Sequence, residues 1–174
     1  MLDDNNGWHF NLKGGDVIRW LEVTNSIYPD FVFRDPARRD ELHPVFVWWH
    51  TLSHLLIRSI STEAGYPSAS IRERVYLERS ASRVRGGILL YAAQPGSEGT
   101  MGGLVALVPH FQQIFQRTFD MLDRCSGDPL CIENQFQSGH YSGAACYGCL
   151  FLSETSCEHR NMWLDRRILR GNLP

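Results

Sequence analysis

The stretch that decides the fold is Cys146-Tyr147-Gly148-Cys149, a pair of cysteines two residues apart on a short glycine-containing turn. The other three cysteines of the chain, Cys125, Cys131 and Cys157, stand nearby in the last third of the sequence. This is the usual spacing of a tetrahedral thiolate zinc site, in which a tight turn supplies two ligands and flanking segments supply the others. We therefore expect a metal-bound segment that joins stretches with little apolar surface of their own.

Five cysteines compete for the four positions of such a site. We predict Cys131, Cys146, Cys149 and Cys157 as the ligands. Cys125 is interpreted either as a ligand in place of Cys131 or as a buried thiol. Four thiolates leave no coordination position for water, so the predicted zinc ion is structural rather than catalytic. The alternative is a set of buried, metal-free cysteines.

The composition is that of a single globular domain. A chain of 174 residues with 43% hydrophobic residues is long enough to bury a core. No run of eighteen apolar residues occurs, so we expect no membrane-spanning helix. The first residues are acidic and lack the apolar stretch of a signal peptide, and an odd number of cysteines favours metal over disulfides. These features together predict a cytoplasmic protein.

The basic residues are almost all arginine, since Lys13 is the only lysine. Lys13 follows Leu12, which excludes a P-loop because that motif needs a lysine directly after a glycine-rich turn. A nuclease of the phospholipase D type is also excluded, because its His-x-Lys pair is absent. The arginine excess is explained either by a GC-rich genome or by recognition of phosphate and carboxylate groups. The net charge of −2 argues against strong DNA binding by the chain alone.

Apolar periodicity predicts an α+β fold with a small β-sheet, several packed helices and a C-terminal zinc-bound segment held by four cysteines. The clearest helix begins at Val45 and is apolar almost all round, which is typical of a buried helix. Residues 1–43 are expected to form an extension packed on, or leading into, a domain of residues 44–174. The expected elements are a helix over 45–60, a helix start with capping-box spacing at 70–73, a strand over 75–77, a buried strand over 87–93, a helix over 104–122 and a final helix over 158–169.

His50 and His54 stand four residues apart on the first of these helices, and Arg58 continues the same row. The spacing is that of a zinc protease helix, but Thr51 stands where the catalytic glutamate belongs, which disfavours that class. Two interpretations remain open. The histidines are either hydrogen-bonded core residues, or they form with Arg58 a polar pocket for a phosphate or a partner.

Two further groups are candidates for binding or support. The loop around Gly99, Thr100, Gly102 and Gly103 follows a predicted strand and opens a helix, where backbone amides can hold an anion. The alternative is tight packing of strand on helix. Asn161 and Asp165, four residues apart, are expected to hydrogen-bond backbone groups that support the metal ligands.

With these residues in place, the chain resembles the MrfA-type zinc-binding domain family over about residues 44–170. The motifs that carry the resemblance come in family order. They are His50-Thr-Leu-Ser-His54, Ser70-Ile-Arg-Glu73, Gly87-Ile-Leu-Leu-Tyr91, Gly99-Thr-Met-Gly102-Gly103, Cys125-x-x-Asp128-Pro129-x-Cys131, Cys146-x-x-Cys149 and Cys157-Glu158-x-x-Asn161-x-x-Leu164-Asp165-Arg166.

The resemblance implies a helicase-associated zinc module, since the family accompanies superfamily 2 DNA helicases, including those of the DISARM and Druantia anti-phage systems. These 174 residues contain no helicase core, so the implied motor is expected as a partner in trans. We therefore predict a non-catalytic zinc-binding subunit of a bacterial defence or DNA-processing complex, acting in assembly and in DNA contact through the complex. The alternative is a free-standing hydrolase or nuclease that uses His50, His54 and Arg58 beside a structural zinc.

Overall fold

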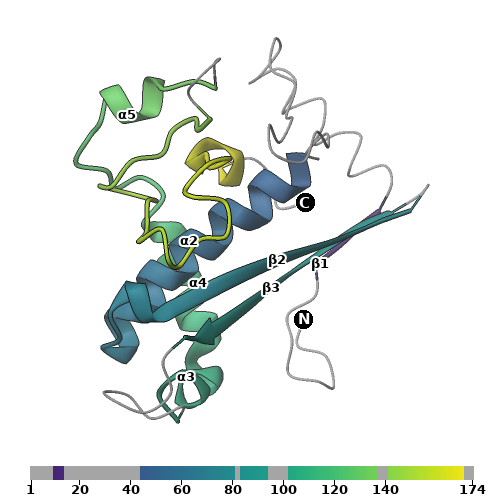
Figure 1. Cartoon of the computed structure of the whole chain (residues 1–174), viewed down its shortest axis with the longest axis vertical. Helices are drawn as coiled ribbons and strands as arrows, with labels where there is room; N and C mark the ends of the chain where they lie inside the picture. The colour runs from purple at the N-terminus through teal and green to yellow at the C-terminus, as the bar shows by residue number, and fades with distance from the viewer. Residues whose placement is uncertain (1–9, 14–43, 81–82, 94–101, 137–140, 171–174) are drawn as a thin grey trace.

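The computed structural model describes residues 10–13, 44–80, 83–93, 102–136 and 141–170 (Figure 1). The central element is helix α2, Pro44–Ala64, in which every side chain from Val45 to Ile57 is buried. The expected buried helix is thereby confirmed. It is followed by Gly65 at φ +68°, a left-handed conformation that costs glycine little and is common just after a helix.

Within the described parts of the chain, three antiparallel strands form a sheet in the order β1-β3-β2. Strand β1 is Phe10–Lys13, β2 is Ile71–Ser80 and β3 is Arg83–Ala92. The expected short strand is thus the middle of a ten-residue strand. The expected helix start at 70–73 is wrong, because the chain from Ile71 to Ser80 pairs with β3 over its whole length. Ile71 and Glu73 are buried on one face, whereas Arg72 and Arg74 are exposed on the other.

Helix α2 covers one face of the β2–β3 hairpin, and the two elements meet closely at Gly86. A Cβ atom there would lie 1.8 Å from Nε1 of Trp49, so only glycine allows this approach. The prediction of a fully buried strand over 87–93 is wrong, since Leu89 and Tyr91 of β3 are exposed. These two side chains point to the sheet face that α2 does not cover.

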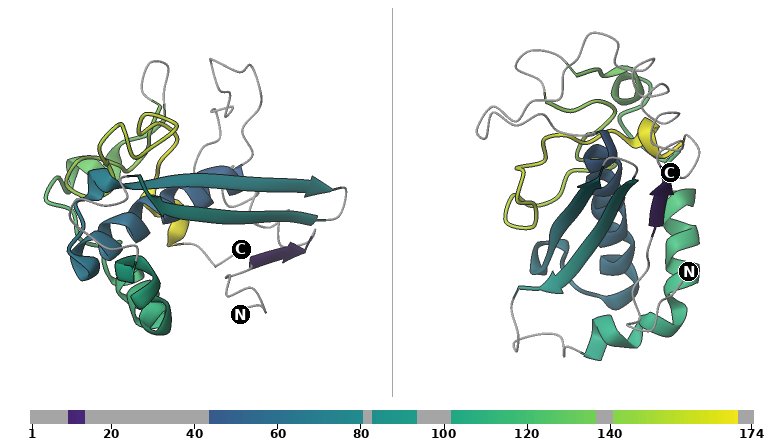
Figure 2. Two further views of the ribbon diagram at one scale, coloured as in Figure 1. Left: turned by 60° about the horizontal axis from the view of Figure 1, so that its bottom comes forward. Right: turned by 90° about the vertical axis from the view of Figure 1, so that its right-hand side faces the viewer.

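The predicted helix over 104–122 is divided into three parts: α3 at Gly102–Ala106, the 3-10 turn η2 at Val108–His110 and α4 at Phe111–Asp120. Pro109 lies at the break, where its ring and missing N–H group prevent a continuous helix. Helix α4 packs on α2 through the buried residues Ile114 and Thr118. Helix α2 therefore lies between the hairpin and α4 (Figure 2).

The C-terminal part consists mainly of turns, with short helix α5 at Leu130–Glu133 and the 3-10 turn η3 at Arg166–Leu169. The predicted helix over 158–169 is wrong. Arg160, Asn161 and Trp163 adopt positive φ angles of 53°, 59° and 65°, which no right-handed helix accommodates. Loops far apart in sequence are thereby brought over α2, and the α+β class with a cysteine-rich C-terminal segment is confirmed. No helix among the described residues is both long and apolar enough to cross a membrane.

Candidate metal centres

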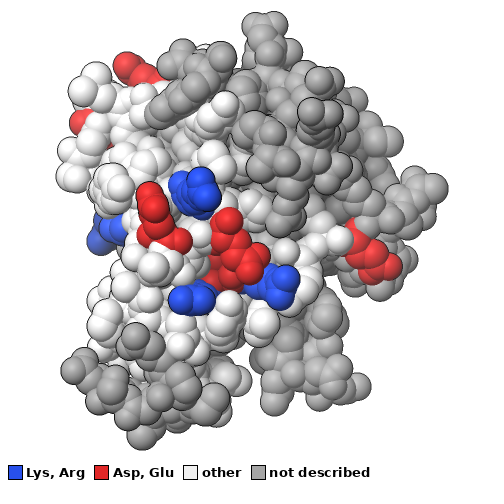
Figure 3. Space-filling model, in the orientation of Figure 1, with Lys and Arg blue, Asp and Glu red and all other residues white. Residues whose placement is uncertain are grey.

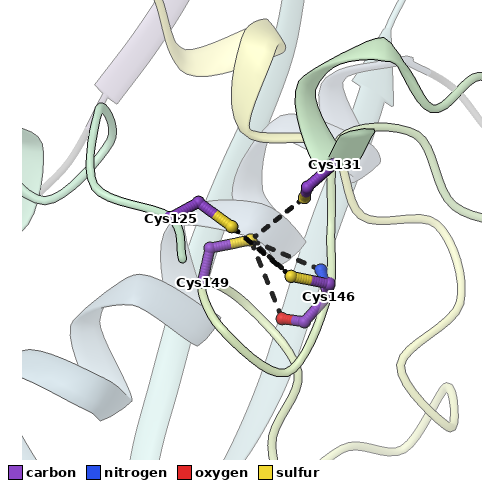
Figure 4. A group of neighbouring side chains, drawn as sticks. All are labelled: Cys125, Cys131, Cys146 and Cys149. Atoms are coloured by element: carbon purple, nitrogen blue, oxygen red, sulfur yellow. Dashed lines mark hydrogen bonds between the residues drawn. The ribbon is translucent and has the colours of Figure 1, made fainter. Parts of the chain in front are cut away.

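Four cysteines converge beside the C-terminal end of α4, and we call this group the cysteine cluster (Figure 4). Cys125 follows α4, Cys131 lies on α5, and Cys146 and Cys149 lie on one turn of the C-terminal loops. All four Sγ atoms are within 4.8 Å of one another. The measured separations are 3.4 Å for Cys125–Cys146, 3.7 Å for Cys131–Cys149 and 3.8 Å for Cys146–Cys149.

These separations fit a tetrahedral zinc site. Zinc–sulfur bonds of about 2.3 Å place the sulfur atoms of a tetrahedron about 3.8 Å apart. Disulfide bonds, at about 2.0 Å, are much shorter, and all five cysteines are free thiols. The sulfur atoms are therefore arranged around a space of the size that a zinc ion needs.

Two glycine turns hold the sulfur atoms in place. The backbone N–H of Gly127 donates to Sγ of Cys125 at 3.3 Å, and the N–H of Cys146 donates to Sγ of Cys149 at 3.3 Å. A Cβ atom on Gly148 would lie 2.7 Å from Oγ of Ser126, so the two turns approach each other at a glycine. Amide donors aimed at sulfur stabilise the thiolate form that binds metal.

The electrostatics of the cluster favour a cation. Burial and the neighbouring sulfur atoms raise the pKa of Cys131 and Cys149 above the ordinary thiol value. Burial alone would also raise the pKa of Cys146, but hydrogen bonds from Cys125 and Cys131 lower it. Four adjacent thiolates therefore repel one another, and a divalent cation among them removes this repulsion.

Two arginines attach the cluster to the rest of the fold. Arg166 is buried, donates from Nη1 to the Leu122 carbonyl at 2.8 Å and forms an ion pair with Asp128. Arg58 on α2 donates to three carbonyl groups at 3.3–3.4 Å, those of Tyr147, Gly148 and Phe151. The cluster is thus fixed on α2 and on the end of α4.

The structure does not place Cys157 with the other three predicted ligands. Cys125 is the fourth member of the cluster, and Cys131 is a member as well. Cys157 lies in a second group with His50, His54 and Glu73, which we call the buried quartet. The ligand atoms of the quartet are also within 4.8 Å of one another, and all four residues are buried.

The quartet is densely hydrogen-bonded at its outer edge. Nδ1 of His50 lies 3.3 Å from the Trp163 carbonyl, and Nδ1 of His54 lies 2.9 Å from the Leu150 carbonyl. Ser53 donates its hydroxyl to Oε2 of Glu73. These contacts fix the orientation of both imidazoles and of the carboxylate.

The inner atoms of the quartet face one another. Nε2 of His50 lies 3.3 Å from Sγ of Cys157 and 2.9 Å from Oε1 of Glu73, and Nε2 of His54 lies 3.4 Å from the same oxygen. Burial alone would raise the pKa of Cys157, but the two histidines lower it to about 6. Burial would likewise raise the pKa of Glu73, but the histidines hold it well below its usual range. Both acidic members therefore favour the anionic form.

Sequence reasoning missed Glu73 as a site residue, although a signal was present. In strand β2 it occupies the same face as Ile71 and Val75, where an apolar residue belongs. A carboxylate on the buried face of a strand requires a partner of opposite charge or several hydrogen bonds. This position therefore pointed to a cationic or metal-binding neighbour.

The other predicted site residues are dispersed. Arg58 shares a face of α2 with the two histidines, but its guanidinium group is directed to loop carbonyls rather than into the quartet. Asn161 supports Cys157, since its backbone N–H donates to Sγ at 3.3 Å and its side chain holds both backbone groups of Leu152 at 2.9 Å. Asp165 instead accepts hydrogen bonds from the backbone and side chain of Arg167 at the start of η3.

The predicted anion loop is only partly placed. Gly99 and Thr100 lie outside the described residues. Gly102 and Gly103 begin the five-residue helix α3. Anion binding by this loop stays a prediction.

Comparison with known proteins identifies the family of the chain and a similar defence protein. The model of the MrfA Zn-binding domain family matches residues 52–150, which include the whole cysteine cluster but only His54 and Glu73 of the quartet. "DISARM protein DrmB" of Bacillus paralicheniformis is 36% identical over 167 residues, an alignment that covers 88% of this chain. The alignment covers 29% of that relative, so the chain spans under a third of its length.

Proposed function

Because the chain belongs to the MrfA Zn-binding domain family, we propose that it is a non-catalytic module that assembles an anti-phage defence complex around a structural zinc ion. The zinc cofactor predicted from the sequence is confirmed by the family together with the cysteine cluster. We assign the ligands as Cys125, Cys131, Cys146 and Cys149. The defence role rests on the similarity to a DISARM protein.

The observation that carries the proposal is the closed set of four sulfur atoms, 3.4–3.8 Å apart where measured. Such a site offers no open position for water or substrate, which favours a structural role. The enzyme alternative lacks an accessible centre among the described residues. His50 and His54 are 0% exposed, and Arg58 is occupied by carbonyl groups.

The surface around the cluster favours contact with protein over contact with DNA. Leu130 and Tyr147, each next to a proposed ligand, are both 76% exposed. Large apolar side chains exposed at the surface are found at docking sites. On the face shown in Figure 3, the described arginines lie among acidic residues rather than in a basic patch. We infer that these two residues contact a superfamily 2 helicase subunit in trans.

The test is co-purification of the chain with a helicase encoded beside it, followed by titration of the complex. We expect Tyr147→Ser and Leu130→Ser each to weaken helicase binding at least about tenfold, as a loss of about 1.4 kcal/mol implies. Val105→Ser on α3 is the matched control, since Val105 is 68% exposed and distant in sequence from the cluster. Equal weakening by the control, or none by either variant, contradicts the assignment.

DNA contact is proposed to occur only through the assembled complex. A duplex oligonucleotide in fluorescence anisotropy, with and without helicase, measures this directly. We expect binding by the isolated chain to be weak, because the net charge is −2 and binding to the DNA backbone requires a basic surface. Tight binding by the isolated chain at physiological salt would instead make it an autonomous DNA-binding domain.

A further inference from the structure

We propose that the buried quartet is a second zinc site, separate from the cysteine cluster. Its ligand atoms are Nε2 of His50, Nε2 of His54, Oε1 of Glu73 and Sγ of Cys157. The proposed docking function requires only the zinc of the cysteine cluster, so this site goes beyond it.

The hydrogen positions on the histidines follow from their outer contacts. A backbone carbonyl can only accept, so Nδ1 of His54 must carry the hydrogen that it gives to Leu150. The same holds for Nδ1 of His50 at the Trp163 carbonyl. With a metal bound, each imidazole is neutral and carries one hydrogen, so each Nε2 then presents its lone pair to the quartet. Histidines that bind metal are commonly oriented in this way. Without metal, burial alone would lower the pKa of both histidines, but Glu73 and Cys157 raise it, that of His50 to about 10, which favours a second hydrogen on Nε2.

The other two members also present lone pairs. Sγ of Cys157 accepts backbone N–H groups from His159 and Asn161, both at 3.3 Å, an environment that favours a thiolate. Among the described residues, Nε2 of His54 and Oε1 of Glu73 are buried without a hydrogen bond of good geometry, although they lie 3.4 Å apart and Oε1 lies 2.9 Å from Nε2 of His50. Lone pairs facing one another in a buried space are unfavourable unless protons or a cation lie between them.

Charge and geometry favour the cation. One carboxylate and one thiolate carry two negative charges, which one divalent ion neutralises at the centre. The separations of 2.9, 3.3 and 3.4 Å between inner atoms approach the edges of about 3.3–3.6 Å expected for a tetrahedral zinc with these ligands. Two imidazoles and a thiolate select zinc over magnesium or calcium, which prefer oxygen.

The turn after Cys157 is built for this site rather than for a helix. Arg160 and Asn161, both at positive φ, curl the chain so that two amide groups point at Sγ of Cys157. Non-glycine residues keep such angles only where the surroundings compensate them. With metal bound, the site would join α2, strand β2 and the C-terminal loop, three elements that are distant in sequence. All four ligands are protein atoms and all are buried, so the site is structural.

The competing explanation uses protons alone. If both imidazoles carry a second hydrogen, the resulting cations pair with Glu73 and Cys157 and no metal is needed. The two explanations differ in the number of zinc ions per chain and in the ligand atoms around zinc.

The experiment is zinc counting on the full chain, purified without chelators and equilibrated with zinc, by elemental analysis and native mass spectrometry. We expect two zinc ions per folded chain. X-ray absorption at the zinc edge should then report an average of about 2.5 sulfur ligands per zinc, with nitrogen and oxygen completing the shell. One zinc surrounded by four sulfur atoms would overturn the proposal.

Two variants assign the sites individually. Glu73→Gln keeps the size of the side chain but removes the anionic ligand, and should leave one zinc with an all-sulfur shell. Cys125→Ser is the matched control. It should weaken the other zinc and leave one ion bound by nitrogen, oxygen and a single sulfur. A Glu73→Gln protein whose second zinc resists chelators as well as the wild-type zinc would also overturn the proposal.

The wild-type protein provides a test that needs no variant. A crystal structure with anomalous data at the zinc edge should show a peak among the four quartet atoms. A peak at the cysteine cluster alone would leave the proposed function intact and refute the second site. A peak at the quartet alone would support the second site and refute the zinc of the cysteine cluster, on which the proposed function rests. The two proposals therefore fail separately.

Discussion

Replacement of Cys125 by serine tests the ligand set most directly, because this residue enters the cluster in place of Cys157. Sγ of Cys125 lies 3.4 Å from that of Cys146 and receives the Gly127 amide at 3.3 Å. If it binds zinc, Cys125→Ser removes one of four thiolates without creating a large cavity. The immediate effect should therefore be on metal affinity rather than on packing.

The size of the effect follows from the energy of structural zinc sites. Binding free energies of about 10–16 kcal/mol, divided among four thiolates, give about 2.5–4 kcal/mol per ligand. At about 1.4 kcal/mol per factor of ten, this corresponds to about two to three orders of magnitude in Kd. Cys125 is half-buried, so water can replace its sulfur, and we expect the lower value, about 100-fold. Cys149 is buried, and Cys149→Ser should reach the upper value.

The assay is competition for zinc with a chromophoric chelator, which gives the Kd of the more weakly and of the more tightly bound zinc ion separately. Ser126→Ala serves as the control, since it alters an exposed side chain of the same turn and no ligand. An unchanged affinity for the cluster zinc in Cys125→Ser would refute the assignment. So would a larger loss of that zinc in Cys157→Ser than in Cys125→Ser.

Three further predictions concern the supports of the site. Gly86→Ala should lower stability by about 1–3 kcal/mol in thermal or urea unfolding, because its methyl group would overlap the indole of Trp49, whereas the exposed Ser126→Ala should change it little. Arg166→Met should lower the free energy of unfolding by about 3 kcal/mol and weaken zinc binding by the cluster, because Asp128 and the Leu122 carbonyl both lose their partner. A variant as stable as the wild type would show that the ion pair is dispensable. Acidification should release zinc cooperatively, because protons compete with zinc for the thiolates. The stability of the fold should therefore fall as the pH falls. Zinc that stays bound in a pH series down to about 4 would contradict ligation by thiolates.

The sequence predicted the elements whose signals are local. Helix α2 was predictable because its apolar residues cover every side, and the structure buries all of them from Val45 to Ile57. The cysteine pair at 146–149 was predictable because one tight turn sets the distance between its sulfur atoms. Both signals depend on residues within a few positions of one another.

The choice between Cys125 and Cys157 depended on contacts that no spacing contains. Cys157 follows Cys149 by only eight residues, but Asn161 clamps Leu152 and directs the intervening loop towards α2. The same residue and its neighbours at positive φ replace the helix that the apolar spacing favoured. Glu73 was missed for a related reason, because its position reads as a capping residue until the strand and its buried face are known.

Helix α2 links the two candidate centres through a single row of side chains. His50 and His54 contribute to the quartet, and one turn further on Arg58 binds the carbonyl of Gly148 in the cysteine turn. Leu150 follows the cluster residue Cys149 in the sequence, and its carbonyl accepts a hydrogen bond from Nδ1 of His54. A shift of this short loop therefore moves a thiolate of one centre and reorients an imidazole of the other. Because a rigid, buried helix holds both contacts, loss of metal at either centre should loosen the other, which an isolated metal-binding loop would not do.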